Sequence, residues 1–164
     1  MNNFKKNHTK IENISFGKNF EVLEPVNLYN CSFGNNCFVG PFVEIQANVK
    51  IGHNSRISSH TFICSNTFIG DDCFIGHGVC FVNDLFKNNE RAGDRKFFLK
   101  TTIGNNVNIG SNATILPVNI CNNVTIAAKS GVTKNINDNK VVAGFPAKDI
   151  KEWKRDIIKA TKKK

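Results

Sequence analysis

Ile51-Gly52-His53-Asn54-Ser55-Arg56 is the first of six consecutive six-residue blocks that run without a break from Ile51 to Phe86. Every block opens on a large apolar residue: Ile51, Ile57, Ile63, Ile69, Ile75 and Phe81. The fifth position of the first five blocks is small or β-branched: Ser55, Thr61, Thr67, Cys73 and Val79. A period this short and regular is typical of a sheet coiled into a solenoid, because one strand and its corner cannot bury an apolar face without neighbours.

Side-chain alternation indicates which residues of this coil face inward. The fifth residue of one block and the first of the next, such as Thr61 and Ile63, are two apart and point to the same side of a strand. We expect that side to be the interior. The third and fourth positions, such as His53-Asn54 and Asp71-Asp72, are then corners, where Asn, Asp and Gly fit turn geometry. Three blocks make a triangular coil of about 18 residues, so residues 18 apart should stack.

The repeat extends to both sides of this stretch. It begins imperfectly at Ile11, becomes regular at Phe33 and resumes at Ile103 after an interruption over residues 87–102. A loop of this length ejected from a strict coil is more often functional than not. Its two ends differ, since a charged arm is followed by the apolar patch Phe97-Phe98-Leu99, which we expect to pack on a neighbouring subunit. We therefore predict one domain over residues 1–164, with a β-helix over about 11–137 and an ejected loop over about 87–102.

The last part of the chain has a different pattern. Residues 141–148 are rich in turn formers and read as an exit from the coil. Asp149 is a candidate helix N-cap, and apolar residues follow at helical spacing: Ile150, Trp153, Ile157 and Ile158. We expect a short amphipathic C-terminal α-helix over about 149–160.

Composition limits the function only weakly. The formal net charge of +9 is compatible with binding of nucleic acid, with binding of anionic small molecules, or with a composition generally rich in Asn and Lys. We expect no nucleic-acid partner. The six cysteines form no C-x-x-C pair and are expected to be free structural thiols. The sequence shows neither a secretory pattern at its start nor an apolar run of membrane-spanning length, and a reducing cytoplasm is expected.

Four motifs resemble the left-handed β-helix acyltransferases that carry the hexapeptide repeat: residues 111–117, residues 143–148, Ser58–Cys64 and Phe74–Asp84. The last two are similar to the branch that N-acetylates amino sugars on nucleotide carriers, such as the dTDP-3-amino-3,6-dideoxyhexose N-acetyltransferases. The resemblance covers residues 33–150 and implies the left hand of the coil, which periodicity alone does not give. It also implies a homotrimer with active sites between neighbouring coils and acetyl-CoA lying along the groove, its adenine end near the exit turn.

The resemblance assigns the chemistry to one corner of the coil. Asn83 is expected to orient the sugar amine and Asp84 to bind the amine or a hydroxyl, with Ser65 stacked 18 residues earlier. Arg91 in the loop is a further candidate for substrate binding, and the related branch often has Glu at the position of Ser65. His77 is the general base by residue type, but it belongs to another corner. A mechanism in which the departing sulfur takes the proton stays open.

The cofactor contacts that the resemblance implies lie in the later coils. Backbone groups near Gly110 and Ala128 would hold the pantetheine arm, lysines would meet the phosphates, and Phe145 with Pro146 would pack on adenine. The lysines are Lys129, Lys134 and Lys148. The sequence departs from the family in lacking Gly after Ile115-Leu116-Pro117 and in having Phe145 where Asn is usual.

Two other functions stay open on the sequence. An O-acetyltransferase acting on another small acceptor would need a His base beside the thioester. The other is a non-catalytic or metal-binding β-helix protein. Its metal-binding version would need three histidines at a subunit interface, and His53, His60 and His77 occupy two corners. We expect no metal, because the exit turn resembles a CoA-type turn.

Overall fold

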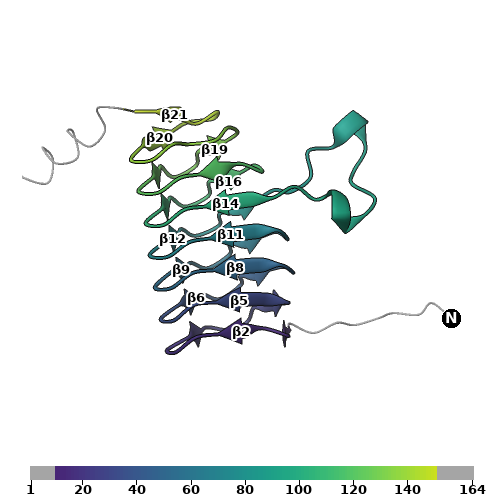
Figure 1. Cartoon of the computed structure of the whole chain (residues 1–164), viewed down its shortest axis with the longest axis vertical. Helices are drawn as coiled ribbons and strands as arrows, with labels where there is room; N and C mark the ends of the chain where they lie inside the picture. The colour runs from purple at the N-terminus through teal and green to yellow at the C-terminus, as the bar shows by residue number, and fades with distance from the viewer. Residues whose placement is uncertain (1–9, 151–164) are drawn as a thin grey trace, which may run out of the picture.

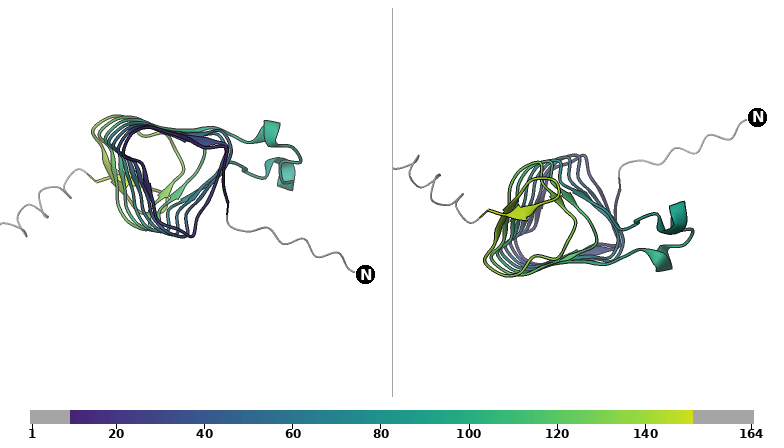
Figure 2. Two further views of the ribbon diagram at one scale, coloured as in Figure 1. Left: turned by 90° about the horizontal axis from the view of Figure 1, so that it is seen from below. Right: turned by 90° about the horizontal axis from the view of Figure 1, so that it is seen from above.

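The computed structural model describes residues 10–150, which form a triangular coil of short parallel strands (Figures 1 and 2). Three sheets make its walls. The first contains β1 (Ile11–Glu12), β4 (Asn27–Tyr29), β7 (Glu44–Ile45), β10 (Phe62–Ile63), β13 (Cys80–Phe81), β16 (Thr114–Ile115) and β19 (Gly131–Val132). The second contains β2 (Ser15–Phe16), β5 (Cys31–Phe33), β8 (Val49–Ile51), β11 (Thr67–Ile69), β14 (Thr101–Ile103) and β17 (Asn119–Ile120).

The third sheet contains β3 (Glu21–Val22), β6 (Phe38–Val39), β9 (Arg56–Ile57), β12 (Phe74–Ile75), β15 (Asn108–Ile109), β18 (Thr125–Ile126), β20 (Val141–Ala143) and β21 (Lys148–Asp149). All pairings in the three sheets are parallel except that of β20 with β21. The predicted fold class, an all-β left-handed parallel β-helix of hexapeptide repeats with an ejected loop, is confirmed.

The predicted vertical stacking is also confirmed. Phe62 pairs with Glu44, Phe68 with Lys50 and Phe74 with Arg56, each 18 residues earlier. Beyond the loop, Thr67 pairs with Thr101, so the loop leaves the coil and returns to the same stack. The ejected segment adds residues to the chain without disturbing the coil.

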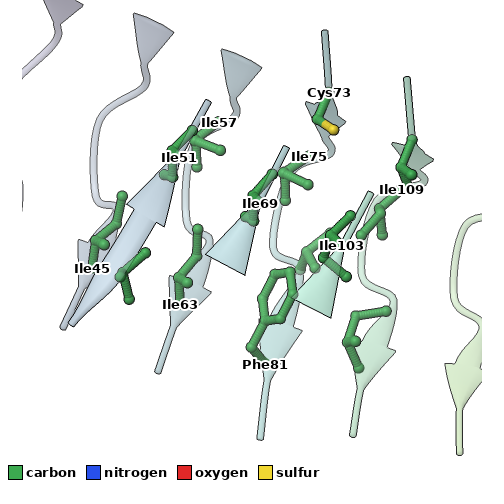
Figure 3. Packing of buried hydrophobic residues seen from close by; sticks show 14 of the residues in the cluster. Ile45, Ile51, Ile57, Ile63, Ile69, Cys73, Ile75, Phe81, Ile103 and Ile109 are labelled. Atoms are coloured by element: carbon green, nitrogen blue, oxygen red, sulfur yellow. The ribbon is translucent and has the colours of Figure 1, made fainter. Parts of the chain in front are cut away.

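Alternation places the core as the sequence predicts. The block-opening residues from Ile51 to Phe81 are at most 4% exposed, and Figure 3 shows them in register along the interior. The fifth-position residues are buried beside them. The buried hydroxyls hydrogen-bond to backbone carbonyls of the next coil. Thr61 Oγ1 donates to the carbonyl of Gly76 at 2.9 Å, and Ser55 Oγ donates to the carbonyl of Gly70 at 3.1 Å. The first coil is atypical, with Phe16 59% exposed at the end of the stack.

The corners take their shape from the fourth position of the repeat. Asn54, His60, Asn66 and Asp72 all have positive φ, as does Gly78. Asn and Asp tolerate this left-handed conformation better than most residues, which explains why they dominate the position. Three corners result, and we name them by their contents. The amide corner holds residues 53–54 and 71–72, the histidine corner holds 59–60 and 77–78, and the loop corner holds 65–66 and 83–84.

The two ends of the regular coil differ from the sequence-based expectation in detail. The coil strand before the loop ends at Phe81 and the next begins at Thr101, so the loop departs earlier than residue 87. It contains the short 3-10 helices η1 (Lys87–Asn89) and η2 (Arg95–Phe97) and projects from the loop corner (Figure 2).

The C-terminal end was expected to start a helix at Asp149, but Asp149 lies in β21 and pairs with Val142. The amide of Ile150 donates to the carbonyl of Val141 at 2.8 Å, which continues the hairpin pairing instead of opening a helix. The rest of the predicted helix, residues 151–160, lies outside the described residues. No helix within residues 10–150 is long and apolar enough to cross a membrane.

Candidate active site at the loop corner

The base of the ejected loop is tied to the coil by backbone and amide contacts. Asn83 Nδ2 donates to the carbonyl of Ser65 at 3.2 Å, so these two residues stack as predicted. The amide of Leu99 donates to the carbonyl of Asn83 at 2.8 Å, and Asn66 Nδ2 donates to the carbonyl of Phe98 at 3.1 Å. Both ends of the loop are therefore held at one corner, above Ser65 and Asn66.

A pocket with a volume of about 560 Å³ lies between the two arms of this loop. Its walls include Asn83, Asp84 and Arg91, three of the residues that the sequence assigned to substrate. The other lining residues are Leu85, Lys87, Asn88, Glu90, Ala92, Gly93, Phe97 and Leu99. The loop thus forms a hollow with apolar and charged walls, a combination common in small-molecule sites.

Asn83 lines this pocket and also bonds the coil below it. Because Nδ2 is used by the carbonyl of Ser65, the orientation leaves Oδ1 without a hydrogen-bond partner among residues 10–150. An amide oxygen accepts hydrogen bonds, so it suits an amine N–H of a substrate. The O and N positions follow from this hydrogen-bond pattern.

Asp84 makes two hydrogen bonds within the loop. Its Oδ1 accepts from the amide of Phe86 at 3.0 Å and its Oδ2 from the amide of Ala92 at 2.8 Å. The first bond closes a local turn, and the second spans eight residues. Both carboxylate oxygens are thus engaged by the chain itself.

Ser65 is buried, 9% exposed, below the pocket. Its amide and its hydroxyl both lie 3.3 Å from Gln46 Oε1, and Gln46 Nε2 donates to Glu44 Oε1 at 3.1 Å. Gln46 is a residue that the sequence reasoning missed. The stacking rule was the signal for it, because the rule places Gln46 under Cys64, the residue next to Ser65.

The neighbouring thiol is unsuited to nucleophilic chemistry. Cys64 precedes Ser65 and is buried, and burial raises the pKa of its thiol from 9.0 to about 11. A thiol with this pKa is almost fully protonated near neutral pH, and the thiolate is the nucleophile. Cys64 therefore fills space at the loop corner.

His77 lies on the histidine corner, outside the loop pocket. Its Nδ1 is 2.8 Å from Ser59 Oγ, and the ring is exposed. With Ser59 and Arg56 it lines a second pocket of about 180 Å³, in which the Arg56 guanidinium lies 3.8 Å from the centre of the Phe38 ring. Within one chain, the structure does not bring His77 together with Asn83.

The proposed cofactor residues fall into two groups. A Cβ on Gly110 would clash with the amide of Ala128, so these residues are in adjacent coils and closely packed. Lys129 follows at the same corner with φ of 58°. In contrast, Lys134 follows β19 of the first sheet and therefore lies near the loop corner, away from Lys129.

The exit hairpin carries the remaining candidates. The ring of Phe145 lies so close to Gly131 that a Cβ there would clash with Cδ2 of the ring, yet Phe145 is 73% exposed. Pro146 follows it in the turn, and Lys148 lies in β21. An exposed aromatic ring that packs on a glycine provides a flat surface on which a nucleotide base can stack.

The three histidines in the described part of the chain do not form a metal site by themselves. His60 and His77 share one corner and His53 lies on the amide corner, where its Nδ1 accepts from the amide of Asn35 at 2.9 Å. Within residues 10–150, no group of three or more His, Cys, Asp or Glu side chains gathers in a metal-binding arrangement.

Two family models match parts of the sequence. The bacterial transferase hexapeptide model, which contains six repeats, matches residues 30–65, and the hexapeptide repeat of succinyl-transferase matches residues 100–134. No curated protein matches the chain.

Solved structures share the fold. A mutant of AntD, an N-acyltransferase from Bacillus cereus in complex with dTDP and coenzyme A, is 25% identical, covers 91% of this chain and 89% of its own, and has a TM-score of 0.77. Galactoside acetyltransferase in complex with coenzyme A is 29% identical over 84% of this chain and 64% of its own, with a TM-score of 0.62.

A third structure supports the fold alone. A mutant of GDP-perosamine N-acetyl transferase from Caulobacter crescentus, in complex with CoA and GDP-perosamine, is 20% identical over 80% of this chain, with a TM-score of 0.60. This chain spans about half the length of that protein, 53%. Residues 30–65 and 100–134 thus match hexapeptide-repeat models, and the chain shares its fold with these acyltransferases, which confirms the repeat and the fold that its motifs indicate.

Proposed function

We propose that this protein transfers the acetyl group of acetyl-CoA to the amine of a nucleotide-linked amino sugar. The acceptor we propose is a dTDP-3-amino-3,6-dideoxyhexose used for surface glycan synthesis in the cytoplasm. One observation carries the proposal: Asn83, Asp84 and Arg91 line a single pocket in a chain that aligns over 91% of its length with an N-acyltransferase bound to dTDP and CoA.

The chemistry needs little more than positioning. The neutral sugar amine attacks the thioester carbonyl, a C–N bond forms, the C–S bond breaks, and the amine proton passes to the departing sulfur to give free CoA thiol. Asn83 Oδ1 orients the amine, and positioning of this kind can supply much of the rate. Arg91 offers a cation to the anionic diphosphate of the nucleotide.

Acetyl-CoA would lie along the later coils in this proposal. Backbone groups at Gly110 and Ala128 would hold the pantetheine arm, Lys129, Lys134 and Lys148 would meet the phosphates, and Phe145 with Pro146 would pack against adenine. On one chain, Lys134 lies near the loop corner, away from Lys129, and a second copy would bring another loop corner beside Lys129. We therefore propose a homotrimer, in which a groove between copies combines the two faces.

The assembly also decides the role of His77. Because it lies on another corner than Asn83, His77 can act as a base only if one chain presents it to the loop corner of the next. An enzyme that used His77 in this way would suit an O-acetyltransferase, since a hydroxyl acceptor must lose its proton to a base.

The experiment measures thiol release from acetyl-CoA with dTDP- and UDP-linked amino sugars and with matched hydroxyl sugars. We expect turnover on an amino-sugar nucleotide, a loss of about 100-fold in kcat for Asn83→Ala, and less than about tenfold for His77→Ala. Turnover on hydroxyl acceptors alone, with His77→Ala inactive and Asn83→Ala active, would establish the O-acetyltransferase instead. Failure of every amino-sugar nucleotide would contradict the proposal.

A further inference from the structure

The two hydrogen bonds of Asp84 have a geometry that a substrate-binding carboxylate does not need. One oxygen binds the amide of Phe86, two residues on, and the other binds the amide of Ala92, eight residues on. The distances are 3.0 and 2.8 Å. A carboxylate that accepts N–H donors on both oxygens is held in a fixed orientation, and hydrogen bonds to a charged acceptor are about twice as strong as neutral ones.

We infer that Asp84 is a positioning residue that fastens the arm of residues 85–92 and thereby shapes the loop pocket, rather than a group that contacts the sugar amine. This inference rests on the proposed function only in taking the loop pocket as the substrate site. The bond to Ala92 draws residues 84 and 92 together, so that Lys87, Glu90 and Arg91 all line the same hollow.

The rest of the loop offers little else to hold this arm. The residues between Asp84 and Ala92 are all exposed, including Leu85 at 50% and Phe86 at 63%. Their backbone bonds are those of η1, in which the amide of Glu90 donates to the carbonyl of Lys87 at 3.2 Å. A segment without buried apolar contacts opens easily. The hydrogen bonds to the Asp84 carboxylate are therefore the main interactions that keep this arm ordered.

The other arm of the loop is fastened without Asp84. Leu99 bonds Asn83, Asn66 bonds Phe98, and the amide of Thr101 donates to the carbonyl of Asn66 at 3.1 Å. Loss of Asp84 should therefore release residues 85–92 and leave both the base of the loop and the coil intact.

Asp84→Asn is the discriminating variant, and Glu90→Gln is its matched control. Asparagine keeps one acceptor oxygen but replaces the other with an NH₂ group, which cannot accept from a backbone amide. Glu90 lines the same pocket, and its side chain has no hydrogen-bond partner among residues 10–150. Both substitutions remove one negative charge, so only the loss of the bond distinguishes them.

Four measurements on the full chain test the inference. Amide hydrogen exchange at Phe86 and Ala92 should be at least about tenfold faster in Asp84→Asn than in the wild type or in Glu90→Gln. Trypsin cleavage after Lys87 and Arg91, measured by the mass of the fragments, should be faster by a similar factor. The thermal midpoint of the coil should stay unchanged. With an amino-sugar nucleotide, KM should rise more than kcat falls, because the pocket is disordered while the reacting groups remain.

The contrary result is equally specific. Unchanged exchange and cleavage in Asp84→Asn, together with a fall in kcat at constant KM, would overturn the inference and place Asp84 on the substrate. The exchange and cleavage results need no substrate, so they stand apart from the proposed function if no acceptor turns over.

Discussion

Gly76 shows how closely successive coils approach at the second position of the repeat. A Cβ at Gly76 would lie 2.7 Å from both the carbonyl oxygen of Ile109 and the amide nitrogen of Ser111. Both atoms belong to the backbone of the next coil and cannot move aside without distorting the stack. The tiny residues at this position are therefore a steric requirement of the coil.

We expect Gly76→Ala to lower the free energy of unfolding by about 1–3 kcal/mol, the usual cost of overpacking. Urea denaturation followed by circular dichroism measures it. Gly93→Ala is the control, because no atom lies within 4 Å of a Cβ at Gly93 in the loop. Equal stability of the two variants would show that the coils have room to separate.

At the scale of an element, the amide corner is stabilised by side chains that bond along the axis of the coil. Asn36 Nδ2 donates to Asn54 Oδ1 at 2.9 Å, and Asn54 Nδ2 donates to Asp72 Oδ1 at 3.0 Å. A parallel set of side chains accepts backbone amides, such as that of His53, which lies 2.6 Å from Asp71 Oδ1. This ladder accounts for the asparagines that recur at the amide corner.

The ladder and the backbone conformation can be separated at Asn54, whose φ is 55°. Asn54→Ala loses both hydrogen bonds and strains the left-handed backbone, whereas Asn54→Gly loses the bonds alone. We expect Ala to be less stable than Gly by about 1–2 kcal/mol, measured by urea denaturation. A Gly variant as unstable as Ala would mean that hydrogen bonding alone shapes the corner.

The sequence predicts most of this element and only part of the site. Strict six-residue spacing predicts the strands, the interior and the stacking of Asn83 on Ser65, since a regular coil leaves few other placements. The path of the loop was not predictable, because its shape depends on Asp84 bonding Ala92, and no periodic pattern marks that pair. The strand at Lys148–Asp149 was missed because an Asp before an apolar-periodic segment fits a helix cap equally well.

At the scale of the whole molecule, buried thiols link stability to pH. Burial raises the pKa of both Cys31 and Cys64 from 9.0 to about 11. A raised pKa means that folding favours the protonated thiol. The resulting stability is fully present below about pH 9 and is lost as the pH rises through about 11.

We therefore expect the free energy of unfolding to fall between pH 9 and pH 11. Urea denaturation at several pH values measures this decline. Burial also raises the pKa values of Cys37, Cys73 and Cys80. Cys64→Ala removes one of these thiols and should make the decline shallower, whatever it does to stability at pH 8. An identical slope in the variant would show that Cys64 ionises as readily in the folded chain as in the unfolded one.

Acetyl transfer at the base of the ejected loop, beside Asn83 and above Ser65, is the claim on which the proposed function depends. A crystal structure with CoA and a dTDP-linked amino sugar tests it most directly. We predict the sugar amine within hydrogen-bond distance of Asn83 Oδ1 and the CoA sulfur next to it. A CoA sulfur bound far from the loop corner, or a sugar seated away from Asn83, would contradict it.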